Sequence, residues 1–182
     1  MIDSQDVVAE RLTAAFDEAD ATLDWVESAH GPAIVRLARL RQALVAAGFG
    51  SLCVAAMTSV AGTVGTRPGE AAGISRVCRE ATELLEAAIG PLAGRWRIDG
   101  IADRLSPEGL GIGVEPASSA VIDQTMTRIG SIILRTVDVL FAVTEDTSVM
   151  PDLREVAAAA LDVFDELEGE TILTVLADLQ SS

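Results

Sequence analysis

The segment QALVAAGFGSLCVAAMTSVAGTVGT, residues 42–66, decides the fold because it contains no charged residue. Three arginines precede it, Arg36, Arg39 and Arg41, and Arg67 follows it. An apolar stretch of this length has to be covered by the rest of its own chain, by another chain or by a lipid bilayer. The remaining sequence is charged and amphipathic with helical spacing, so we expect it to be organised around this segment.

The composition predicts an all-α protein. The chain has 182 residues, enough for one domain with its own core, and we expect residues 1–182 to form a single helical domain. Apolar residues make up 49% of the chain but aromatic residues only 3%, so the core must consist of Ala, Val, Leu and Ile. Small side chains recurring with a helical period favour helices that approach one another closely.

The apolar spacing predicts a bundle of six to eight helices. Residues 51–64 are apolar all round and are the natural central helix. Gly48-Phe49-Gly50 is expected to separate this helix from the one before it, and Gly90-Pro91 to end a later one. Residues 92–115 are rich in Gly and Pro and are expected to form an irregular connection. The expected helices cover residues 4–29, 33–47, 51–64, 71–89, 116–143, 151–167 and 170–179, with residues 66–70 as a turn and helix cap before the fourth.

Charge and missing residue types exclude several functions. The net charge of −15 argues against nucleic acid and anionic membranes as partners. Lys, Asn and Tyr are absent, as expected for a high-GC bacterial genome, and the absence of Lys excludes a Schiff-base lysine and a Walker-type phosphate loop. Cys53 and Cys78 lie in apolar stretches and are expected to be buried thiols in the reducing cytoplasm.

The single histidine limits metal and nucleophilic chemistry. Glu27-x-x-His30 matches half of a ferritin-type iron motif, but a second histidine is lacking. Nothing in the sequence fixes His30 beside a serine or cysteine nucleophile. We therefore expect no catalytic residue, no metal and no cofactor.

Carboxylates spaced three residues apart leave an enzymatic alternative open. Pairs at this spacing share one helix face and can hold Mg²⁺ against a phosphate. The alternative function is an all-helical Mg-dependent phosphohydrolase or a small-ligand-binding bundle. In each helix, however, these acids lie opposite the apolar side, where solvated charges are normal. The sets are Asp17 with Asp20, Glu80 with Glu83 and Glu86, and Asp162 with Asp165 and Glu168.

The preferred function is that of a non-enzymatic assembly or adaptor protein, which acts through protein–protein contacts and self-associates into a homo-oligomer. A membrane-associated protein is a lesser alternative, because residues 42–66 are long enough to span a bilayer. Their Ala, Ser, Thr and Gly content disfavours insertion. Arg36 and Arg39 are expected to pair with acids of a neighbouring helix or subunit. The core or interface candidates are Arg36, Arg39, Leu52, Met57, Val60 and Trp96.

Overall fold

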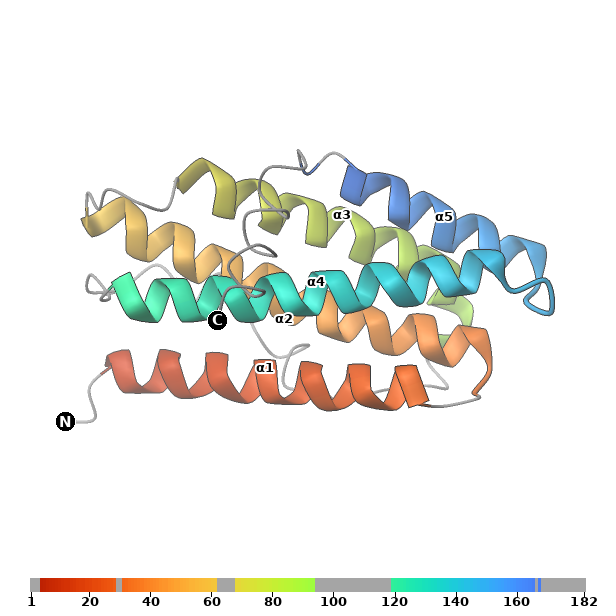
Figure 1. Ribbon diagram of the computed structural model, residues 1–182, viewed down its shortest axis with the longest axis horizontal. Coiled ribbons are helices and arrows are strands. Elements are labelled where there is room, and N and C mark those ends of the chain that lie inside the picture. The colour runs from red at the N-terminus through yellow and green to blue at the C-terminus, as the bar shows by residue number, and fades with distance from the viewer. Residues whose placement is uncertain (1–3, 29–30, 62–67, 94–118, 166, 168–182) are drawn as a thin grey trace.

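Five helices form the described part of the protein, and they pack as a bundle (Figure 1). A computed structural model describes residues 4–28, 31–61, 68–93, 119–165 and 167. The all-α prediction is confirmed. Residues 94–115 of the expected irregular connection, and the expected helix over 170–179, lie outside the described residues. The helices are α1 (Ser4–Ser28), α2 (Ala33–Ala61), α3 (Pro68–Ala93), α4 (Ser119–Glu145) and α5 (Pro151–Asp165).

Helix α2 is the centre of the bundle, as the uncharged segment predicts. It contacts each of the other four helices (Figure 1). Leu37, Leu40 and Leu44 are completely buried along its first half, and Val54 along its second. Burial on every side explains why this helix has almost no polar face.

The expected break at Gly48-Phe49-Gly50 is wrong, because α2 runs through these residues without interruption. Both glycines lie where a neighbouring helix comes close. A Cβ atom on Gly48 would lie 3.2 Å from Cβ of Cys78, and one on Gly50 would lie 2.6 Å from Cζ of Phe16. Tertiary packing therefore outweighs the cost of about 1 kcal/mol for each glycine inside a helix.

The amphipathic helices bury the sides that the sequence predicts. In α1, for example, Leu12, Ala19 and Leu23 are all buried. The predicted end of α3 at Gly90-Pro91 is wrong, since the helix continues to Ala93. The buried apolar side chains of α4 and α5 are Ile122, Met126, Ile129, Ile132, Ile133, Val139, Leu140, Val143, Leu153, Ala157, Ala160 and Phe164.

Candidate functional site

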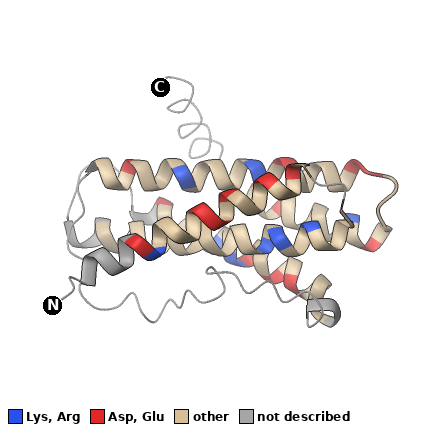
Figure 2. Ribbon diagram, turned by 90° about the horizontal axis from the view of Figure 1, so that it is seen from below, with Lys and Arg blue, Asp and Glu red and all other residues tan. Residues whose placement is uncertain are grey.

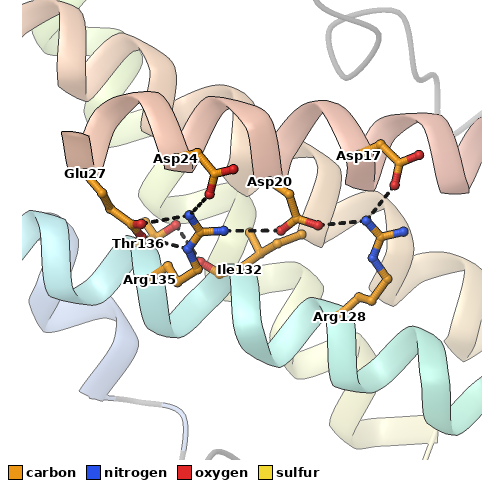
Figure 3. A network of polar contacts seen from close by, with 8 residues as sticks. All are labelled: Asp17, Asp20, Asp24, Glu27, Arg128, Ile132, Arg135 and Thr136. Carbon is orange, nitrogen blue, oxygen red and sulfur yellow. Dashed lines mark hydrogen bonds and ion pairs between the residues drawn. The ribbon is translucent and has the colours of Figure 1, made fainter. Parts of the chain in front are cut away.

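The densest polar cluster in the described part of the chain lies between α1 and α4 (Figure 3). The two helices run in the same direction and lie side by side (Figure 1). Acidic residues 17, 20, 24 and 27 share one side of α1, because their spacings of three and four residues follow the helical repeat. Arg128 and Arg135 are two turns apart on α4, so each faces a different half of this acidic side (Figure 3).

Arg135 bonds three carboxylates. Its Nε donates to Oε1 of Glu27 at 2.7 Å, and its Nη2 donates to Oε2 of Glu27 at 2.8 Å, so this pair is bidentate. The same Nη2 donates to Oδ1 of Asp24 at 2.6 Å, and Nη1 donates to Oδ1 of Asp20 at 3.5 Å. The hydrogen bonds to Glu27, followed by those to Asp24, raise the pKa of Arg135 despite partial burial. This guanidinium is therefore a permanent cation, fixed in orientation.

Arg128 holds the other half of the cluster. Its Nη2 donates to Oδ2 of Asp20 at 2.7 Å and to Oδ1 of Asp17 at 2.8 Å. Partial burial lowers the pKa of Arg128, but the bonds to Asp20 and Asp17 outweigh this effect and raise it. The guanidinium also lies 5.0 Å from the centre of the Phe16 ring. Asp20 joins the two halves, because it accepts from both arginines.

The cluster consists of ion pairs that join two helices. Each of its carboxylates already accepts a hydrogen bond from a guanidinium. The described residues contain no group of three or more His, Cys, Asp or Glu side chains placed to hold a metal ion. The arrangement therefore fixes α1 against α4 and sets their register.

The four α1 acids of this cluster were expected on a solvated side, and they are at least 38% exposed; the structure also pairs them with arginines of α4. The sequence interpretation placed the acids opposite the apolar side of their helix and did not identify Arg128 and Arg135 as their partners. A signal was present: the two arginines are seven residues apart, as are Asp17 and Asp24. Such matched spacing is what two parallel helices need to pair charges over two turns.

The acids of the other helices are dispersed. In α3, Glu80 and Glu83 form exposed pairs with arginines one turn earlier, and Glu86 lies 3.5 Å from Nε of Arg41. Asp162 and Asp165 are exposed on α5. The described acids thus do not converge on one cleft.

Arg36 and Arg39, which precede the apolar run, have different neighbours. Cζ of Arg39 lies 3.9 Å from the centre of the Trp25 ring, a cation–π contact between α2 and α1. Hydrogen bonds from Ser148 lower the pKa of Asp146, and the positive charge of Arg36 adds to this effect. Within the described ranges neither arginine forms an ion pair with a carboxylate, and pairing with a second subunit stays a prediction.

The remaining candidates do not form a common site. Met57 is buried and belongs to the core, whereas Leu52 is only partly buried. The side chain of Val60, and all of Trp96 and His30, lie outside the described residues.

Both cysteines are free and buried, as expected. Burial raises the pKa of the Cys53 and Cys78 thiols to about 12. Because the thiolate is the reactive form, neither thiol is suited to nucleophilic chemistry in the folded protein.

One described helical segment, Ala33–Met57, is long and apolar enough to cross a membrane. In this bundle 67% of its most apolar window is buried against other helices. The core helix of a soluble protein has the same length and composition, so this finding is weak evidence for a membrane span.

Large apolar side chains are exposed along α4 and just after it. Val121 is 48% exposed and Phe141 58% exposed, near opposite ends of the helix, and Met150 in the following turn is 62% exposed. In the described residues these are the large apolar side chains that the bundle leaves open to solvent.

Comparison with known proteins found no match to this chain among protein-family models, curated proteins or solved structures.

Proposed function

We propose that this protein is a non-enzymatic, cytoplasmic assembly or adaptor protein that acts through protein–protein contacts and associates with itself. The observation that carries the proposal is the set of exposed apolar side chains on and beside α4, namely Val121, Phe141 and Met150. Aromatic side chains and Met are enriched where proteins bind one another.

The polar groups support the same proposal. Four α1 acids neutralise arginines of α4, and the described acids elsewhere are spread over α3, α4, the turn after α4 and α5. This dispersal is typical of charges that orient helices and keep a protein soluble, rather than of a catalytic cleft. The thiols of Cys53 and Cys78 have raised pKa values and are not suited to act as nucleophiles.

Light scattering after size-exclusion chromatography tests self-association. The wild-type chain has a mass of 19.0 kDa, and we expect a measured mass that is a multiple of this value. Val121→Gln should shift the protein toward 19.0 kDa, since it removes apolar contact area from the start of α4. Arg79→Gln, which changes an exposed residue of α3, is the control and should leave the mass unchanged.

A wild-type mass of 19.0 kDa at every protein concentration would overturn self-association. An oligomer that Val121→Gln leaves intact would show that the start of α4 is not the contact surface.

A further inference from the structure

The α4–α5 corner, which we define as residues 138–155, combines exposed apolar side chains with unpaired acids. It contains the end of α4, the turn that follows and the start of α5, and it projects at one end of the bundle (Figure 1). Phe141 and Met150, the two most exposed large apolar side chains of the described residues, both belong to it.

Local hydrogen bonds hold this corner in one shape. The Asp146 carbonyl accepts the Val149 N–H at 3.0 Å, and Oδ1 of Asp146 accepts the Ser148 N–H at 2.9 Å. The carbonyl of Met150 accepts the N–H groups of residues 153 and 154, which fixes the start of α5. A surface that is already ordered loses little conformational freedom when it binds a partner.

The charges around the exposed side chains are acidic and lack partners within the described part of the chain. Figure 2 shows acidic segments on both sides of the turn. The α1 acids, by contrast, are paired with arginines. The nearby Arg36 and Arg154 act on Asp146, and both are only partly exposed. The unpaired, exposed acids are Asp138, Glu145, Asp152 and Glu155.

We propose that the α4–α5 corner binds a basic amphipathic segment of a partner protein. The apolar side of that segment packs on Phe141 and Met150, and its Lys or Arg side chains face the four unpaired carboxylates. This inference rests on the proposed function and names the class of partner. Two corners facing each other across a symmetry axis would set acids against acids, so we assign self-association to the Val121 end of α4 and the corner to the basic partner.

Two synthetic peptides test the inference on the full-length protein. The first is an 18-residue amphipathic helix of Leu and Lys, and the second has Glu at every Lys position. Binding is measured by fluorescence anisotropy of the labelled peptide at low and at high salt. We expect the basic peptide to bind at low salt and to weaken as salt rises, and the acidic peptide not to bind.

Matched variants separate the corner from the general negative charge of the protein. The corner variant is Asp138→Asn/Glu145→Gln/Asp152→Asn/Glu155→Gln. The control removes four exposed acids elsewhere, as Glu10→Gln/Asp123→Asn/Asp162→Asn/Asp165→Asn. Both sets change the net charge equally, and circular dichroism checks that each variant folds. We expect the corner variant to lose at least about tenfold in affinity, and the control less than about threefold.

The apolar part of the surface is tested separately by Phe141→Gln/Met150→Gln, for which we also expect a loss of at least about tenfold. Equal losses in the two charge variants, binding of the acidic peptide, or no binding of the basic peptide to wild type would each overturn the inference. The light-scattering result is independent of these outcomes. If the protein is an oligomer that does not bind the basic peptide, only this inference is refuted. If it is a monomer that binds the peptide at the corner, only self-association is refuted.

Discussion

Adding one methyl group at Gly50 should destabilise the protein, although alanine is the better helix former. Gly50 lies inside α2, where a Cβ atom would be 2.6 Å from Cζ and 3.0 Å from Cε1 of Phe16. Real Cβ atoms essentially never approach another atom as closely as 2.6 Å, so the Phe16 ring would have to move. The Phe16 side chain is buried, and Ile129 and Arg128 of α4 lie close by, which leaves the ring little room.

The magnitude follows from two opposing effects. Replacing Gly by Ala in a helix interior gains about 1 kcal/mol. Forcing an extra carbon into a packed core costs about 1–3 kcal/mol. Because the contact is short and the ring is enclosed, we expect the cost at the upper end, and Gly50→Ala should lower the free energy of unfolding by about 1–2 kcal/mol.

Gly73 provides the matched control. It lies inside α3, and a Cβ atom there would meet nothing within 4 Å. Gly73→Ala should therefore raise the free energy of unfolding by about 0.5–1 kcal/mol. Urea denaturation followed by circular dichroism measures both variants, and an unchanged m-value shows that the comparison is valid.

A double-mutant cycle identifies the clash. Phe16→Leu removes the far end of the ring, so Gly50→Ala should cost less in that background, with a coupling of at least about 0.5 kcal/mol. If Gly50→Ala stabilises the protein as much as Gly73→Ala does, the close approach of α1 to α2 at this glycine is refuted.

Three further predictions concern the polar groups. Arg135→Gln leaves three α1 acids without their common counter-ion and should lower the free energy of unfolding by about 1–2 kcal/mol. The control Arg79→Gln, which removes one exposed ion pair, should lower it by under about 0.5 kcal/mol. Equal losses of unfolding free energy in urea denaturation would contradict a cooperative network. The two buried thiols should resist iodoacetamide in the native protein and react on unfolding, and rapid native labelling would show that they are accessible. Their contribution to stability is complete below the ordinary thiol pKa of 9.0 and should be lost as pH rises toward about 12. Ser148→Ala should raise the pKa of Asp146 toward 3.8 in NMR titration. The substitution removes the Ser148 hydroxyl, which donates to Oδ1 of Asp146 at 2.6 Å, and keeps the backbone N–H bond, so an unchanged Asp146 titration would exclude the hydroxyl as a cause. The lowered pKa of Asp146 stabilises the fold above the unfolded pKa, and this effect is lost as pH falls through the folded value.

The sequence by itself determined the fold class, the sides that each helix buries and the central place of the uncharged segment. These properties follow from local spacing: apolar residues three and four apart form one side of a helix, and a helix with no polar side has to be surrounded. The buried seams of α1 and α4, and the contacts of α2 with all four neighbours, confirm this reasoning.

Only the tertiary structure decided which glycine ends a helix and which charged side pairs with another helix. Local helix propensity predicts that a helix ends at Gly48 and Gly50. Cys78 and Phe16 lie so close to these positions, however, that glycine is what allows the helices to pack together. Likewise, the spacing of Asp20 places it on a polar side, but the position of α4 determines that this side, still 38% exposed at Asp20, also pairs with Arg128 and Arg135. The physical reason is the same in both cases: these outcomes depend on distances between residues far apart in the chain, which a local pattern does not contain.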